Sequence, residues 1–182
     1  MIIGYRFSQN GNDSYMLLDS DFPRCPSCGM KLDSYWVNRD FNLKRRSQDL
    51  SITYDGYTIV SDAFREAVNG EGDVEFISLP ALCGFYILKP NERIPLDTVR
   101  TGTRFEDRCD RCGRFTSVAG VGDYELLTDG CLPDRVMRTD VELGWLNEQH
   151  PVLLVGPGLG RRLLALELAG VDLAAIDDDK WR

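Results

Sequence analysis

The chain has 182 residues, of which 43% are hydrophobic and 27% are charged, and its formal net charge is −8 at pH 7. This composition is typical of a soluble globular protein and excludes a disordered or fibrous class. The negative charge opposes binding to a phosphate backbone, so we expect no nucleic acid partner, and it suits a basic protein partner as well as simple solubility.

The N-terminal segment predicts a strand and not a targeting signal. Residues 2–7, IIGYRF, are rich in β-branched and aromatic residues. The segment lacks the basic region and the apolar run of about 7–15 residues that a secretory signal requires, and no apolar stretch of the chain is as long as a membrane span. We therefore expect a cytoplasmic protein without membrane contact.

The first half of the chain contains a predicted hairpin. Residues 36–50 include a basic cluster, KRR, that is too short for a nucleic-acid groove, and we expect this segment to be a solvated loop. The segments 52–54 and 57–60 are rich in β-branched and aromatic residues and flank the turn dipeptide Asp55-Gly56. This pattern predicts two strands joined by a tight turn.

A strand–helix–strand unit follows from the second strand of the hairpin. Ser61 is a favourable N-cap for a short helix, and Phe64 lies on the apolar face of that helix. Gly70 is suited to end the helix, because glycine readily adopts the left-handed conformation found there. The apolar run 74–79 then predicts the next strand.

The C-terminal segment has a similar order of elements. Residues 152–155 predict a strand, the Gly-Pro-Gly break at 156–158 starts a Leu-rich helix extending to Ala169, and Gly170 ends it before a strand over 171–176. The runs IVSDAFREAV and LVGPGLGRRL share the strand end and the first helical turn. Duplication of a small βα unit explains this likeness, and so does a common local pattern.

The run GPGLG at 156–160 has some likeness to a dinucleotide-binding fingerprint, because it follows a strand, opens a helix and has Asp177 about twenty residues on. A dinucleotide-binding half needs a further helix and strand after the acidic residue, and five residues follow Asp177. A simple helix start is therefore the preferred interpretation, and no nucleotide is expected.

The predicted elements indicate an α+β protein with mixed or antiparallel sheets and few short helices. We expect one compact unit over residues 1–182, with two βα-containing lobes of about 1–100 and 101–182 that meet in the Pro-, Thr- and Gly-rich segment 90–105. A four-cysteine zinc site joins the two lobes in this prediction.

Four of the six cysteines form two CxxCG motifs. A gap of two residues lets both thiolates of a pair face one cation, and the glycine that follows can turn backbone N–H groups toward the sulfurs. Two such pairs supply the four sulfurs of a closed tetrahedral zinc site. We therefore predict one structural zinc ion, held by Cys25, Cys28, Cys109 and Cys112.

The 80 residues between Cys28 and Cys109 exceed the roughly 15–20 residues of a compact zinc ribbon, so the intervening segment must itself fold. Two separate redox dithiols and unligated buried cysteines are the alternatives, and redox chemistry is typical of a CxxC at the start of a helix after a buried strand. Here Pro23, Pro26 and Gly29 predict a turn around the first pair, and a strand is predicted directly after the second.

The other chemistry-bearing residues do not indicate an enzyme. Four cysteines close the coordination shell, so no position stays open for a catalytic water. The single histidine, His150, stands directly before Pro151 and is interpreted as a surface or capping residue. We expect no enzymatic activity, and the sequence assigns no role to Cys83 or Cys131.

The three tryptophans are candidates for partner contacts, because tryptophan is frequent in binding hot spots. Trp36 and Trp145 are more simply explained as core residues. Trp181 is then the candidate interface anchor, next to an acidic run at 177–179 that we expect to be solvated.

The two distant CxxCG motifs resemble those of the double-CxxCG immunity proteins of bacterial polymorphic toxin systems. The run CDRCGR at 109–114 looks like the second knuckle of that family. The run RTD at 138–140, followed by a strand, a helix and Gly170-Val171, is similar to its C-terminal half. The acidic and aromatic middle of the chain matches no motif of the family.

This resemblance implies a cytoplasmic antitoxin that binds and neutralises one cognate toxin, with the zinc site as a scaffold. An acidic chain suits a basic nuclease or a membrane-active toxin. The alternatives are a zinc-binding regulatory or adaptor module with an unknown protein partner, and a CxxC dithiol redox protein.

Overall fold

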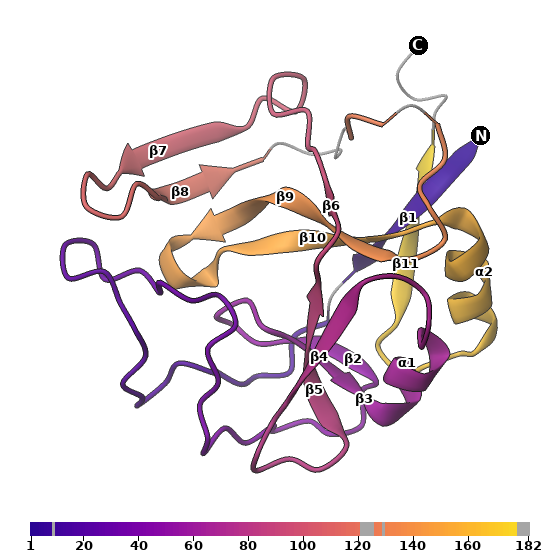
Figure 1. Ribbon diagram of the computed structural model, residues 1–182, viewed down its shortest axis with the longest axis horizontal. Helices are drawn as coiled ribbons and strands as arrows, with labels where there is room; N and C mark the ends of the chain where they lie inside the picture. The colour runs from indigo at the N-terminus through magenta and orange to yellow at the C-terminus, as the bar shows by residue number, and fades with distance from the viewer. Residues whose placement is uncertain (9, 121–125, 129, 178–182) are drawn as a thin grey trace.

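The structure is a computed structural model that describes residues 1–182 except 9, 121–125, 129 and 178–182. Within these described residues, two β-sheets are accompanied by two short α-helices (Figure 1). Neighbouring strands are mostly antiparallel and the helices are few, which confirms the predicted α+β class. Trp181 and the acidic residues 178–179 lie outside the described part of the chain.

The larger sheet contains strands from both ends of the sequence. Its strands are β1 (Ile2–Ser8), β6 (Arg93–Ile94), β7 (Arg104–Arg108), β8 (Phe115–Ala119), β9 (Val136–Trp145), β10 (His150–Val155) and β11 (Asp172–Asp177). In the described residues their order is β11-β1-β10-β9-β8-β7, with β6 beside β9. Because β1 is antiparallel to both neighbours, β10 and β11 run parallel to each other with β1 between them.

The smaller sheet is built from β2 (Leu50–Ile52), β3 (Thr58–Ser61), β4 (Val74–Ser78) and β5 (Phe85–Pro90). Its order is β2-β3-β5-β4, and all neighbours are antiparallel. The predicted hairpin is confirmed as β2 and β3, and Gly56 in its loop has a φ of 83°. The strand β5 was not predicted, although its run FYIL carries the β-branched and aromatic residues of a strand.

The two α-helices are α1 (Asp62–Ala67) and α2 (Pro157–Ala165). The predicted cap of α1 is confirmed, because the Ser61 hydroxyl accepts a 3.2 Å hydrogen bond from the Phe64 N–H. The predicted extension of α2 to Ala169 is wrong. The backbone of Ala169 instead pairs with Asp49, whose N–H donates to the Ala169 carbonyl at 2.6 Å and whose carboxylate accepts from the Ala169 N–H at 2.9 Å.

The start of α2 is capped by a residue from another loop. Gly156 at the N-cap has no side chain to offer, and the Asp134 carboxylate accepts hydrogen bonds from the N–H groups of Gly158 and Leu159, at 2.5 and 3.1 Å. This carboxylate stands where a phosphate would bind at an open helix N-terminus. The contact supports the interpretation of the glycine-rich run as a helix start.

The two strand–helix–strand units have the same topology. In the unit β3-α1-β4 the strand β5 lies between the two parallel strands, and in β10-α2-β11 this place belongs to β1. The helices lie side by side at one end of the molecule (Figure 1), where an ion pair joins Arg162 of α2 to Glu71. Their apolar faces share one core between the sheets, with Phe64, Val68, Leu159 and Leu163.

A second core lies beneath the irregular segment 10–49. Phe41 and Leu43 are almost completely buried against the smaller sheet, which corrects the prediction of a solvated loop over residues 36–50. Burial alternates over residues 41–44, so the apolar Phe41 and Leu43 face inward while their neighbours Asn42 and Lys44 are exposed. The basic residues 44–46 that follow are exposed, as expected.

The predicted boundary between two lobes near residue 100 coincides only in part with the division of the strands between the two sheets. Residues before it form the whole smaller sheet, while β1 and β6 from the same half join the larger one. Side chains from both sheets contribute to the shared core. No helix within the described residues is long and apolar enough to cross a membrane.

Candidate metal centre

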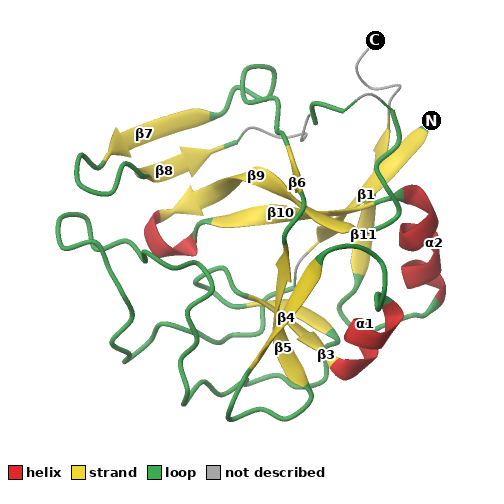
Figure 2. Cartoon of the chain, in the orientation of Figure 1, coloured by secondary structure: helices red, strands yellow, loops and turns green. Residues whose placement is uncertain are grey.

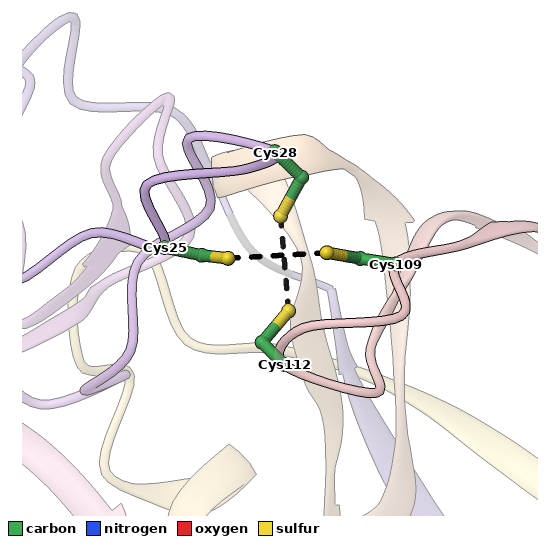
Figure 3. A group of neighbouring side chains, drawn as sticks. All are labelled: Cys25, Cys28, Cys109 and Cys112. Carbon is green, nitrogen blue, oxygen red and sulfur yellow. Dashed lines mark hydrogen bonds between the residues drawn. The ribbon is translucent and has the colours of Figure 1, made fainter.

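Four sulfur atoms from two distant parts of the chain converge on one point (Figure 3). Residues 25–29 form the first knuckle, and residues 109–113 form the second, between β7 and β8. The structure brings together all four predicted ligands, and their sulfurs lie within 4.8 Å of one another. This set is Cys25, Cys28, Cys109 and Cys112.

The two knuckles have the same backbone geometry. The N–H of Cys25 donates to the carbonyl of Met30, and the N–H of Cys109 donates to the carbonyl of Arg114, both at 2.8 Å. The glycine after each pair donates a 2.8 Å hydrogen bond back to the first cysteine, with φ values of 77° and 74°. A side chain is strained at such angles, so the local sequence CxxCG itself specifies the turn.

The distances between the knuckles fit a metal ion. The Sγ atoms of Cys25 and Cys109 are 3.8 Å apart, and those of Cys28 and Cys112 are 3.7 Å apart. A zinc–sulfur bond of about 2.3 Å gives a tetrahedron with edges of about 3.8 Å. A disulfide needs about 2.05 Å, and all four cysteines are free. The four residues therefore have the spacing that a tetrahedral metal site requires.

Backbone N–H groups favour the thiolate form of the first cysteine in each knuckle. Hydrogen bonds from the N–H groups of Cys112 and Arg111 lower the pKa of Cys109 to about 6. In the first knuckle, the N–H groups of Cys28 and Ser27 lower the pKa of Cys25 in the same way. Metal ions bind the thiolate, so these hydrogen bonds prepare the sulfurs for a cation.

Cys28 shows the effect of crowding four thiols together. The Met30 N–H lowers the pKa of Cys28, but burial and the three neighbouring thiols outweigh it and raise this pKa to about 12. A bound cation would lower this pKa, because it attracts the negative charge of each thiolate. The cluster is thus better suited to a metal than to four free thiols.

The knuckles carry an excess of positive charge. Five basic side chains lie within the knuckles or up to two positions from them, against the two carboxylates of Asp107 and Asp110. Four thiolates around a divalent ion have a net charge of −2, which this basic surrounding stabilises. The five residues are Arg24, Lys31, Arg108, Arg111 and Arg114.

The two knuckles are also joined by protein contacts. Arg114 donates to the Lys31 carbonyl at 2.7 Å and pairs with Glu142 at 3.0 Å. The Lys31 ammonium is buried, donates to the Asp55 carbonyl at 2.8 Å and lies 4.8 Å from the centre of the Tyr57 ring. This network has no signal in the sequence, since only the proximity of the knuckles brings its members together.

The remaining residues of chemical interest lie outside the cluster. Cys83 and Cys131 are exposed and free. His150 is half-buried, its Nδ1–H donates to the Glu148 carbonyl at 2.8 Å, and burial lowers its pKa. This contact agrees with the predicted capping role. Trp145 is 59% exposed, so its predicted place in the core is wrong.

Comparison of the chain with protein-family models, with curated protein sequences and with solved structures returns no match. The resemblance to double-CxxCG immunity proteins therefore stays a prediction that rests on the cysteine motifs. The structure adds the observation that both motifs adopt the same turn and meet in one cluster.

Proposed function

We propose that this chain is a zinc-stabilised cytoplasmic immunity protein that binds and neutralises one cognate bacterial toxin. The observation that carries the proposal is the four-sulfur cluster formed by two CxxCG knuckles 84 positions apart. It is the feature on which the resemblance to immunity proteins rests. The net charge of −8 adds support, because an acidic surface speeds association with a basic toxin.

The proposed metal is zinc, bound for structure. Four thiolates at tetrahedral spacing are typical of zinc or of iron–sulfur chemistry, and a closed shell of four cysteines is the usual structural zinc site. Such a shell leaves no coordination position for a substrate, which favours binding over catalysis. Elemental analysis of the purified protein distinguishes the metals: we expect one zinc per chain, and stoichiometric iron with sulfide contradicts this part of the proposal.

Toxicity rescue tests the immunity function. A strain expressing the toxin encoded beside this gene should survive when the protein is co-expressed, and it should die when the protein is replaced by an unrelated acidic protein of similar size. The purified pair should form a complex. If no adjacent gene product is toxic, or if toxicity persists at high levels of the folded, zinc-loaded protein, the immunity proposal fails.

The main alternative is a zinc-binding regulatory or adaptor module, which shares the metal centre and differs in its partner. A folded, metal-loaded protein that forms a stable complex with a non-toxic neighbour supports this alternative. Dithiol redox chemistry is the other candidate, and the lowered pKa of Cys109 favours it. That chemistry requires a metal-free protein whose four clustered thiols oxidise and are reduced reversibly.

A further inference from the structure

Exposed apolar side chains gather at one hollow between the segment 15–22 and the 3₁₀ turn η1 (Leu146–Glu148). The hollow has a volume of about 320 Å³, and we call it the Trp145 groove. Leu18, Trp145 and Tyr15 are 61%, 59% and 46% exposed. Exposed apolar side chains that gather in one place are typical of a protein-binding surface. The lining includes Tyr15, Leu18, Phe22, Trp145, Leu146 and Glu148.

The groove has an acidic surrounding. Glu148 is one of its walls, and Asp19 and Asp21 are neighbours of the lining residues in the chain. All three side chains are exposed, and none forms an ion pair or a hydrogen bond within the part of the chain that the structure describes. The guanidinium of Arg24 lies over the Phe22 ring, 4.5 Å from its centre. Carboxylates therefore outnumber cations around the apolar lining.

The walls of the groove are held in place before any partner binds. The Asp55 carboxylate accepts hydrogen bonds from the N–H groups of Met16 and Leu17, at 3.0 and 2.6 Å, and fixes one wall. Leu146 in the opposite wall has a φ of 46°, a left-handed conformation that costs free energy for a residue with a side chain. Such strain persists only where surrounding contacts impose it.

Residues just after the two cysteine knuckles contact this turn. Asn147 of η1 accepts a 2.6 Å hydrogen bond from the N–H of Lys31, and Gln149 donates a 2.8 Å hydrogen bond to the carbonyl of Phe115. Lys31 follows the first knuckle and Phe115 follows the second. Figure 2 shows η1 at the tip of the β9–β10 hairpin, so the segments that follow the two knuckles support the hairpin end that carries Trp145.

We propose that the Trp145 groove is the docking surface for an apolar side chain flanked by lysine or arginine residues on a basic partner protein. The apolar lining receives the side chain, and the unpaired carboxylates of Asp19, Asp21 and Glu148 receive the flanking cations. The knuckles keep the groove open, which reduces the entropy lost on binding. The inference deepens the proposed function, because the partner is then the toxin.

A peptide titration tests the groove without any knowledge of the toxin. The probe is the synthetic peptide KRWLRK, added to ¹⁵N-labelled, zinc-loaded full-length protein, with EEWLEE as the charge-reversed control. We expect saturable NMR shifts of the Trp145 indole N–H and of the Leu18 amide with the basic peptide alone. Trp145→Ala should abolish the saturable shifts of Leu18, and Leu164→Ala, at an exposed leucine of α2, should leave them unchanged.

The toxin provides the second test. Trp145→Ala and the charge reversal Glu148→Lys should each lower the affinity for the neutralised toxin by at least about 30-fold, as loss of a hot-spot contact does. Leu164→Ala should change it by no more than about twofold. The zinc content and the melting temperature of each variant must match those of the wild type. If Trp145→Ala does not meet this criterion, the affinity of Glu148→Lys alone decides the test.

The outcomes separate the two proposals. If immunity holds and both groove variants bind the toxin as the wild type does, the groove inference is overturned and the function stands. If no toxin is neutralised, the function fails and the peptide titration alone decides the groove. Shifts that do not saturate, or that appear equally with the acidic peptide, overturn the inference.

Discussion

Arg114 donates a hydrogen bond of 2.7 Å from Nη1 to the backbone carbonyl of Lys31. The donor directly follows the second knuckle and the acceptor lies two residues after the first, so this bond joins the same two segments that the four sulfurs join. The proposed metal and this protein contact would thus hold the same two distant parts of the chain. Their contributions can be separated by mutation.

We expect Cys28→Ser and Cys112→Ser each to release the metal and to lower the free energy of unfolding by several kcal/mol, because metal binding to such sites is coupled to folding. Cys83→Ser is the matched control, since Cys83 is exposed and lies outside the cluster. Metal analysis together with thermal denaturation provides the measurement. A Cys28→Ser protein with stoichiometric zinc and wild-type stability would contradict the metal assignment.

Arg114→Ala should cost about 2–3 kcal/mol while the metal content stays stoichiometric, because the Lys31 carbonyl and Glu142 lose a charged partner. Arg114→Lys should lower the free energy of unfolding by less, since its ammonium can still pair with Glu142. Urea denaturation of the zinc-loaded proteins measures the difference. Arg111→Ala, at an exposed arginine of the same knuckle, should stay within about 0.5 kcal/mol of the wild type.

Lys31 should make stability rise with pH. Burial lowers the pKa of Lys31 from 10.5 to about 8, so between these values the folded state binds fewer protons than the unfolded state. The free energy of unfolding then increases by about 2 kcal/mol between pH 7.5 and pH 9.5. Lys31→Met should remove this increase in urea denaturation, whereas Lys44→Met, at an exposed position, should keep it. An unchanged slope in Lys31→Met would refute the assignment.

Asp49 should couple the two strand–helix–strand units. Its carboxylate accepts from the Ser61 hydroxyl at 2.6 Å, at the cap of α1, and from the Ala169 N–H at 2.9 Å, after α2. We expect Asp49→Ala to cost about 2 kcal/mol and Ser61→Ala about 1 kcal/mol. The double variant should lose less than the sum, because one hydrogen bond is shared. Strict additivity in urea denaturation would argue against the coupling, and Ser47→Ala is the exposed control.

Local patterns predicted much of the fold. The cap at Ser61, the Gly56 turn and the strand ends depend on interactions between residues close in sequence, so their residue types alone indicate them. The end of α2 was misplaced because Glu167 adopts a left-handed φ of 50° just after the helix, which glycine usually supplies, and Ala169 then pairs with Asp49, more than a hundred residues away. The strand β5 was missed, although it completes the smaller sheet between two strands that the sequence did predict.

The sequence by itself determined the candidate ligands, since the CxxCG spacing sets the turn and aims two sulfurs at one point through local backbone geometry. Only the tertiary structure decided that the two turns meet, that Lys31 is buried beside them and that Trp145 faces solvent at a groove. These features depend on contacts between segments far apart in the chain. No local pattern of residue types encodes such contacts, because burial is a property of the assembled sheets and loops.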